Sequence, residues 1–210
     1  MLTSLHLNIF RRESDRKAAN VNLIVMAIFS FFALLAAFQL SVDKVHLLEH
    51  PEAKLSCSIN VVLNCTSVMK TPQASLLGFP NSFIGIIGFS IFLFFAISSL
   101  LGTKYTKIIL RLLLAGILGA WIFALWLFFD SLYVIQILCP WCLLTTLSTT
   151  IVFATLLRMV LMDNVLGLKK SYQKKIQNEL RKDYDRLFFA AILVVLVLLI
   201  VAKFGDNLIS

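Results

Sequence analysis

Charged residues are scarce in this sequence, and long polar regions are few. Of its 210 residues only 14% are charged whereas 60% are hydrophobic, and the mean hydropathy is +0.91. No internal repeat, low-complexity linker or long soluble region is left once the apolar segments are set aside. This composition excludes an ordinary soluble domain and predicts a membrane protein.

Five apolar segments approach the length that crosses a bilayer, about 20 helical residues for a hydrocarbon core of about 30 Å. They are residues 21–40, 82–101, 108–129, 140–157 and 187–202. The last is the shortest, so we expect it to tilt little or to thin the bilayer locally. The first has a longer apolar run and a longer polar lead-in than a cleaved signal peptide, so we interpret it as a retained anchor.

Basic residues predict the orientation of these segments, because they favour cytoplasmic connections. Most of the 19 lysines and arginines lie before the first segment, between the second and third, or between the fourth and fifth. Arg111 lies just inside the third segment, and the exceptions on the other face are Lys44, Lys54, Lys70 and Lys203. The N-terminus is therefore predicted to be cytoplasmic and the C-terminus to be outside. The net charge of +8 follows from this bias and requires no nucleic-acid partner.

The connection between the fourth and fifth segments has an additional pattern. Apolar residues recur at three- or four-residue spacing, at Val165, Leu168, Tyr172, Ile176, Leu180 and Tyr184. Lysines and arginines occupy the other faces over residues 165–186, which predicts an amphipathic basic helix on the anionic cytoplasmic leaflet. The simpler interpretation is a topology determinant with no other role.

The predicted topology places all four cysteines outside the cytoplasm, where disulfides persist. Cys139 and Cys142 form a Cys-Pro-Trp-Cys motif. Because proline is favoured at the first helical position, we expect the fourth helix to begin at Pro140, with Cys139 near its N-cap and Cys142 in its first turn. The positive end of the helix dipole favours the reactive thiolate. Trp141 and the preceding "LYVIQIL" predict an apolar pocket for a membrane-soluble electron acceptor.

The other two cysteines, Cys57 and Cys65, lie in a long polar loop predicted over residues 41–81. Loops of this length are usually functional or disordered, and this one can fold over the CxxC motif. Two alternatives remain. The pairs can be purely structural disulfides, although a CxxC ring contributes little stability. His46 and His50 can also join the loop cysteines in a metal site, although they are more simply interpreted as solvated interfacial residues.

Two stretches resemble the bacterial homologues of vitamin K epoxide reductase. "CSINVVLNCTSVMKTPQASLLGFPNSFIGI" resembles their first extracytoplasmic loop and second span, and "CPWC" resembles their redox motif. The resemblance covers residues 21–157. The spaced pair comes first and CxxC second, the reverse of the DsbB-type quinone oxidoreductases.

The resemblance implies an all-α polytopic membrane protein in the bacterial inner membrane. A four-helix transmembrane bundle would surround ubiquinone or menaquinone under an extracytoplasmic loop cap. The implied divisions are this membrane domain over 1–157, a basic connector over 158–186, and a fifth helix with a short tail over 187–210. Many bacterial members continue into a thioredoxin-like domain, whereas only "KFGDNLIS" follows the fifth segment here. The redox partner is therefore expected to be a separate thioredoxin-like or DsbA-like protein.

The resemblance also implies an order for the cysteines. Cys57 resembles the outer loop cysteine that exchanges with the partner, and Cys65 the inner one that exchanges with Cys139. Cys142 resembles the cysteine that reduces the quinone. The pairs would then form a relay that supports disulfide bond formation.

Four further residues are candidates for the quinone site. Asn81 resembles the asparagine that hydrogen-bonds a quinone carbonyl in vertebrate members. Thr146 stands where those members have a tyrosine, so a hydroxyl is kept and a ring is lost. Trp141 is expected in the pocket, and Ser67 lies near a functional loop serine or threonine. Because no Asp or Glu falls within the apolar segments, the protons are expected from the loop, from hydroxyls such as those of Thr145 and Thr146, or from water.

Overall fold

The computed structural model describes residues 13–55, 57–58 and 62–208, and almost all of the regular structure in them is helical. The elements are α1 (Glu13–Glu49), α2 (Cys65–Met69), the 3₁₀ helix η1 (Pro72–Ser75), α3 (Asn81–Leu100), α4 (Lys107–Asp130), the π-helical turn η2 (Ser131–Ile135), α5 (Pro140–Met162), α6 (Lys170–Arg181) and α7 (Tyr184–Leu208). Five of these helices are long and apolar enough to cross a membrane. The predicted all-α polytopic membrane fold is confirmed.

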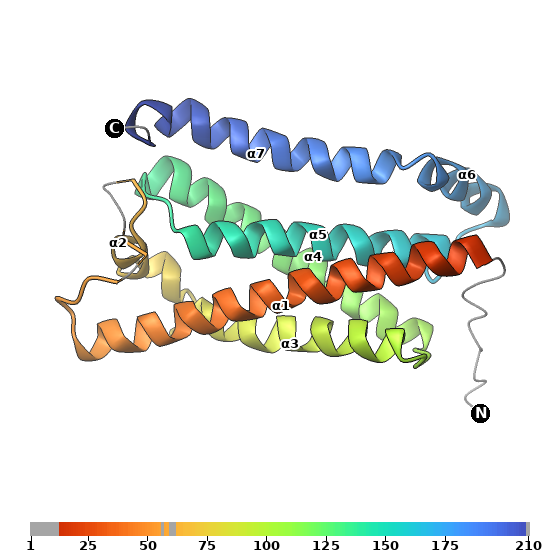
Figure 1. Ribbon diagram of the computed structural model, residues 1–210, viewed down its shortest axis with the longest axis horizontal. Helices are drawn as coiled ribbons and strands as arrows, with labels where there is room; N and C mark the ends of the chain where they lie inside the picture. Colours follow the sequence, from red (N-terminus) through yellow and green to blue (C-terminus); the bar gives the residue numbers. More distant parts are fainter. Residues whose placement is uncertain (1–12, 56, 59–61, 209–210) are drawn as a thin grey trace.

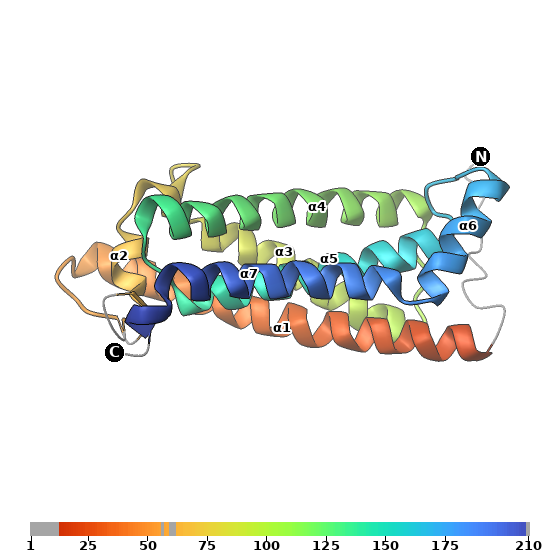
Figure 2. The ribbon, with the colours of Figure 1, turned by 90° about the horizontal axis from the view of Figure 1, so that it is seen from above.

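Four long helices form the bundle, and α7 runs along its outside (Figures 1 and 2). α1 packs against α3 and α5, and α4 packs against α5. Fully buried side chains such as Met26, Ile117 and Leu156 fill the space between these helices. α6 lies at one end of the bundle, hereafter the basic end. α2 and the first turn of α5 lie at the opposite end, hereafter the cysteine end.

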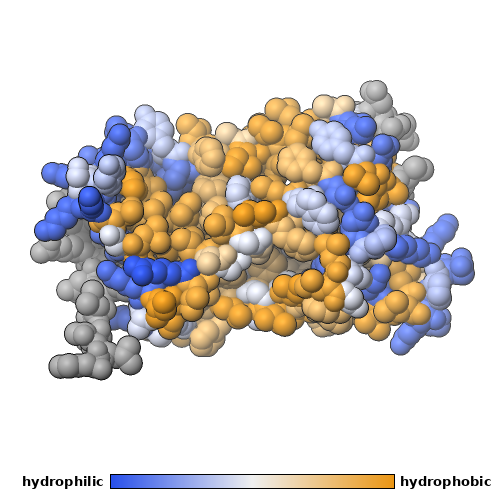
Figure 3. Space-filling view, turned by 180° about the vertical axis from the view of Figure 1, so that it is seen from behind, coloured by the Kyte–Doolittle hydropathy of each residue, from blue (hydrophilic) through white to orange (hydrophobic). Residues whose placement is uncertain are grey.

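The outer surface of the bundle is suited to lipid. Figure 3 shows an apolar band across the middle of one face of the molecule, with hydrophilic residues gathered towards both ends. Large apolar side chains are well exposed within this band, including Phe94 at 69% and Leu112 at 65%. Exposed apolar surface on this scale is unfavourable in water and matches the hydrocarbon core of a bilayer.

The first helix is longer than the apolar segment that predicted it. α1 continues from Leu40 to Glu49, because no proline or glycine interrupts it before Pro51. The residue before a proline disfavours helical geometry, which accounts for an end at Glu49. The loop expected over residues 41–81 is therefore shorter, since its first part is helix and α3 begins at Asn81.

The connector and the fifth helix also differ from the expected boundaries. α5 extends beyond residue 157 to Met162, and α7 is a full-length span rather than a short one. The predicted amphipathic helix forms only over Lys170–Arg181. Gly167, with a φ of +77°, interrupts the pattern before it, because positive φ suits glycine and breaks a helix. Val165 is consequently buried against the bundle instead of lying on α6.

Asp163 at the C-terminal end of α5 gives a prediction about pH and stability. Burial raises the pKa of its carboxyl group to about 7. A raised pKa means that the folded protein binds this proton more tightly than the unfolded chain does. Ionisation of Asp163 therefore lowers the free energy of unfolding. This loss is absent at low pH and grows as the pH rises towards 7. Asp163→Asn is expected to stabilise the protein by about 1–3 kcal/mol at pH 8 and by much less at pH 5. Thermal unfolding in detergent at both pH values measures this, and an equal effect at the two would contradict the assignment.

Candidate active site

The CxxC motif begins α5, as the sequence predicts. Cys139 is the N-cap, and Pro140 occupies the first helical position. The Cys142 backbone N–H donates to the Cys139 sulfur at 3.3 Å, which satisfies one of the otherwise unpaired donors at a helix start. Helix geometry therefore holds the two cysteines together at the cysteine end.

The same local geometry activates Cys139. A hydrogen bond from the Cys142 side chain is the main factor that lowers the pKa of the Cys139 thiol, and the backbone N–H groups of Cys142 and Trp141 add to it. Burial and the charge of Asp43 oppose this effect without cancelling it. Because the thiolate is the nucleophile in disulfide exchange, Cys139 is prepared to react.

The two loop cysteines are joined in a disulfide, with their Cα atoms 5.6 Å apart. Cys65 is the first residue of α2 and is completely buried. Cys57 is 8% exposed, so it is the more accessible of the two residues. The structure thus places Cys57 outside Cys65.

A short backbone bridge brings this disulfide to the CxxC motif. The Leu138 N–H donates to Val62 O at 2.7 Å, and the Asn64 N–H donates to Leu138 O at 2.9 Å. Leu138 and Asn64 directly precede Cys139 and Cys65, so the bridge aligns the two cysteines. Their sulfurs are 3.5 Å apart, close enough for exchange after a small approach.

Polar side chains fix the shape of the loop around Cys65. Asn64 caps α2 by accepting from the Ser67 backbone N–H at 3.1 Å, and it also accepts from the Ser58 hydroxyl at 3.0 Å. The Thr66 hydroxyl lies 2.9 Å from that of Ser58 and accepts from the Leu55 N–H. Asn64 is a structural residue of the site that the sequence reasoning missed, although its place before a short helix is a capping signal.

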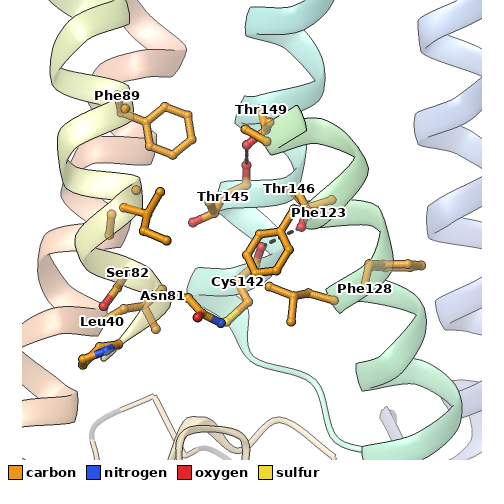
Figure 4. A pocket seen from close by; sticks show the side chains of 18 of the residues that line it. Leu40, Asn81, Ser82, Phe89, Phe123, Phe128, Cys142, Thr145, Thr146 and Thr149 are labelled. Carbon is orange, nitrogen blue, oxygen red and sulfur yellow. Dashed lines mark hydrogen bonds between the residues drawn. The ribbon is translucent and has the colours of Figure 1, made fainter. Parts of the chain in front are cut away.

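A cavity of about 530 Å³ opens beside the CxxC motif, among α1, α3, α4 and α5. Its volume falls in the range of small-molecule sites. Apolar side chains form most of its wall, including Phe89, Phe92, Phe123 and Phe128. Polar groups line it as well, among them Lys44, Asn81, Ser82, Cys139, Cys142, Thr145, Thr146 and Thr149. Figure 4 shows α5 presenting Cys142 and Thr145 towards the side of the cavity that holds Asn81.

The candidate quinone residues divide into two groups. Asn81 and Thr146 line the cavity, whereas Trp141 and Ser67 do not. Trp141 packs instead against the buried cluster that contains Cys57, Cys65 and Cys139, because residues at the start of α5 point in different directions around the helix. Ser67 lies in α2, where its backbone N–H donates to the side chain of Asn64, the N-cap of this helix.

Asn81 and Thr146 both have partners within the protein. The Asn81 amide donates to Gln73 O at 2.6 Å and accepts from the Leu76 N–H at 3.2 Å. The Thr146 hydroxyl donates to Cys142 O at 3.0 Å. Asn81 has a second N–H, and the Thr146 oxygen has an acceptor lone pair, so each can also serve a ligand.

Asp43 and Lys44 lie near the site because α1 is longer than expected. Lys44 lines the cavity and donates to Met69 O at 2.5 Å. Asp43 Oδ2 lies 3.9 Å from the Cys57 sulfur. The lack of a helix breaker before Pro51 is the signal in the sequence that could have placed both residues on α1.

The metal alternative gains no support. Within the described part of the chain, no three His, Cys, Asp or Glu side chains come together in a way that could hold a metal ion. The rings of His46, on α1, and His50, just after its end, lie 5.2 Å apart, and both residues are exposed. The sulfurs of Cys57 and Cys65 are bonded to each other.

The fold and the cysteine arrangement define a helical membrane oxidoreductase that acts through paired cysteines. The vitamin K epoxide reductase family matches residues 24–157, and the chain belongs to this family. The match begins within α1 and ends within α5, so it includes the loop with α3 and α4 and stops before the connector. No curated protein matches the sequence closely enough to count as a relative.

Proposed function

We propose that the protein carries electrons from a thioredoxin-like or DsbA-like partner through its two cysteine pairs to a membrane quinone, and so supports disulfide bond formation. The observation that best supports this is the 3.5 Å separation of the Cys65 and Cys139 sulfurs. Cys142, on the other side of Cys139, faces an apolar cavity. The four cysteines therefore lie in series between the loop surface and the membrane interior.

The first half of the reaction is a chain of thiol–disulfide exchanges. A partner thiolate attacks Cys57, the Cys57–Cys65 bond breaks, and the electron pair leaves on Cys65. The Cys65 thiolate then attacks Cys139 in an oxidised Cys139–Cys142 pair, and the electron pair leaves on Cys142. Each step forms one S–S bond and breaks one, so no further oxidant is needed.

The loop pair then closes again. The second thiol of the partner attacks the partner–Cys57 bond, which releases the oxidised partner and frees Cys57. Attack of Cys57 on the Cys65–Cys139 bond restores the loop disulfide and releases Cys139. These steps would leave the loop disulfide closed and the CxxC cysteines reduced. In the structure, likewise, Cys57 is bonded to Cys65, and Cys139 and Cys142 are free.

The residues that line the cavity fit a quinone. The apolar wall suits a ring and a prenyl chain, and Asn81, Thr145 and Thr146 supply polar groups near Cys142. Bound there, a quinone would supply an acceptor for two electrons and two protons. Cys142 would be the sulfur that meets it, and the mostly apolar wall would limit the access of water.

The basic residues support an orientation for this chemistry. α6 and the other lysine-rich connections gather at the basic end, opposite the cysteines. We therefore place the basic end in the cytoplasm and the cysteine end outside the bacterial inner membrane. In this orientation Cys57 meets its partner in an oxidising compartment.

The proposal is tested with purified protein, a small dithiol and a soluble quinone. Thiol-dependent quinol formation is the expected result, and its absence would refute the enzyme assignment. Metal analysis of the same sample addresses the metal-binding alternative, which requires stoichiometric zinc or copper that is lost in His46→Ala.

Two glycines in the cavity wall lead to a prediction about quinone binding. Gly88 on α3 and Gly116 on α4 line the cavity, with open space where a side chain would begin. Gly116→Leu is expected to raise the KM for quinone about tenfold or more, because a leucine would fill part of the cavity. Gly119→Leu is the matched control, since Gly119 lies on α4 with equal space but does not line the cavity. Equal KM values for the two variants would contradict a quinone site in this cavity.

A further inference from the structure

Asp43, a carboxylate that the exchange steps above do not use, lies beside Cys57, the outermost cysteine of the relay. Its side chain is held in place near the end of α1, because Gln39 Nε2 donates to Asp43 Oδ1 at 2.8 Å. Its other oxygen lies 3.9 Å from the Cys57 sulfur, and the residue is only 7% exposed. A buried and oriented carboxylate at this distance acts strongly on any charge that forms on Cys57.

No cation of the described chain forms an ion pair with Asp43. Lys44, its neighbour on α1, directs its ammonium group to Met69 O instead, and the two histidines that follow along the chain, His46 and His50, are exposed. The loop also carries Glu52 and Lys54, which are exposed, so the titratable groups that meet Asp43 inside the protein are cysteines. The loop contributes the Cys57–Cys65 disulfide, and α5 contributes Cys139, which is sensitive to the charge of Asp43. The negative charge of Asp43 therefore acts mainly on the nearby cysteine sulfurs.

The two ways of opening the loop disulfide differ in where the negative charge appears. Attack on Cys57 by an incoming thiolate sends the electron pair to Cys65. Attack on Cys65 by Cys139 sends the electron pair to Cys57, beside Asp43. A like charge disfavours a thiolate, and the more stable thiolate is the better leaving group.

We propose that Asp43 is a directing carboxylate that makes Cys57 the poorer leaving group of the loop disulfide. Electrons then enter through Cys57 and move inward, and the loop disulfide resists reduction from within by Cys139. This inference rests on the proposed relay. It assigns the direction of the relay to a residue outside the four cysteines.

The first test isolates Cys57 as the only thiol, with Cys65, Cys139 and Cys142 changed to serine. The rate of alkylation by neutral iodoacetamide is measured from pH 6 to pH 11, and its half-point reports the pKa of Cys57. Asp43→Asn in this background is expected to lower the half-point by about one pH unit or more. An unchanged or raised half-point would overturn the proposal.

Two controls separate charge from structure. Asp43→Glu keeps the charge and should keep a high half-point. Glu49→Gln removes an exposed negative charge from the same helix and should leave the half-point unchanged. If Asp43→Asn does not fold, Asp43→Ser replaces it as the variant that removes the charge, and the same lowered half-point is expected.

The second test measures direction in Cys142→Ala, where Cys139 can exchange only with the loop pair. The fraction with a Cys65–Cys139 bond is determined by mass spectrometry after acid quenching and alkylation. Asp43→Asn should raise this fraction several-fold at pH 9 and hardly change it at pH 6, where the released Cys57 is protonated with or without Asp43. A change that is equal at both pH values would contradict a charge effect. Neither test uses a quinone, so a failure of quinone reduction is distinguishable from a failure of this inference.

Discussion

Cys142→Ala is expected to lower thiol-driven quinone reduction by at least about 100-fold, because it removes the sulfur that would meet the quinone. Cys142 lines the apolar cavity from the first turn of α5. Cys139 borders the same cavity, but it is 1% exposed and its sulfur lies against Cys65. Cys139 alone therefore cannot complete a two-electron transfer. Quinol formation with a small dithiol as the donor is the measurement.

Cys57→Ala is the matched comparison and should keep much more of this activity. A small dithiol can reach a cysteine pair without the outermost sulfur, whereas a protein partner needs Cys57. Activity with a thioredoxin-like partner should therefore fall sharply in Cys57→Ala. Near-complete activity of Cys142→Ala with the dithiol would refute the assignment of Cys142.

The elements that could be predicted from the sequence are those that depend on local rules. Hydropathy located five membrane helices, because the bilayer imposes a length on each. Pro140 placed the start of α5 and the N-cap position of Cys139, because proline has a fixed φ and no N–H to satisfy. The motifs of residues 57–86 and 139–142 indicated the family, which the match over residues 24–157 confirms.

The features that could not be predicted depend on how far a helix continues and where its side chains point. Hydropathy ends the first segment at Leu40, but helical hydrogen bonding carries α1 to Glu49. This extension brings Asp43 to Cys57 and Lys44 to the cavity. Trp141 lies within the CxxC motif and was expected at the pocket, yet its direction around α5 places it against the cysteines. Spacing along the chain does not determine such directions.

The order of the loop cysteines can be tested by cross-linking, and we expect a large difference in disulfide formation between two double variants. Cys57→Ala/Cys142→Ala leaves Cys65 and Cys139, whose sulfurs are 3.5 Å apart, within reach of a disulfide after a small approach. This variant should oxidise almost completely with a mild oxidant such as diamide.

Cys65→Ala/Cys142→Ala, which leaves Cys57 and Cys139, is the control and should stay mostly reduced. Leu138 pairs its backbone with Val62 and Asn64, so the bridge holds Cys65 rather than Cys57 beside Cys139. Non-reducing mass spectrometry after alkylation distinguishes the two variants. Preferential cross-linking of Cys57 with Cys139 would reverse the order of the relay, because Cys57 would then be the inner cysteine. The result therefore decides which loop sulfur meets the partner and which passes the electrons inward.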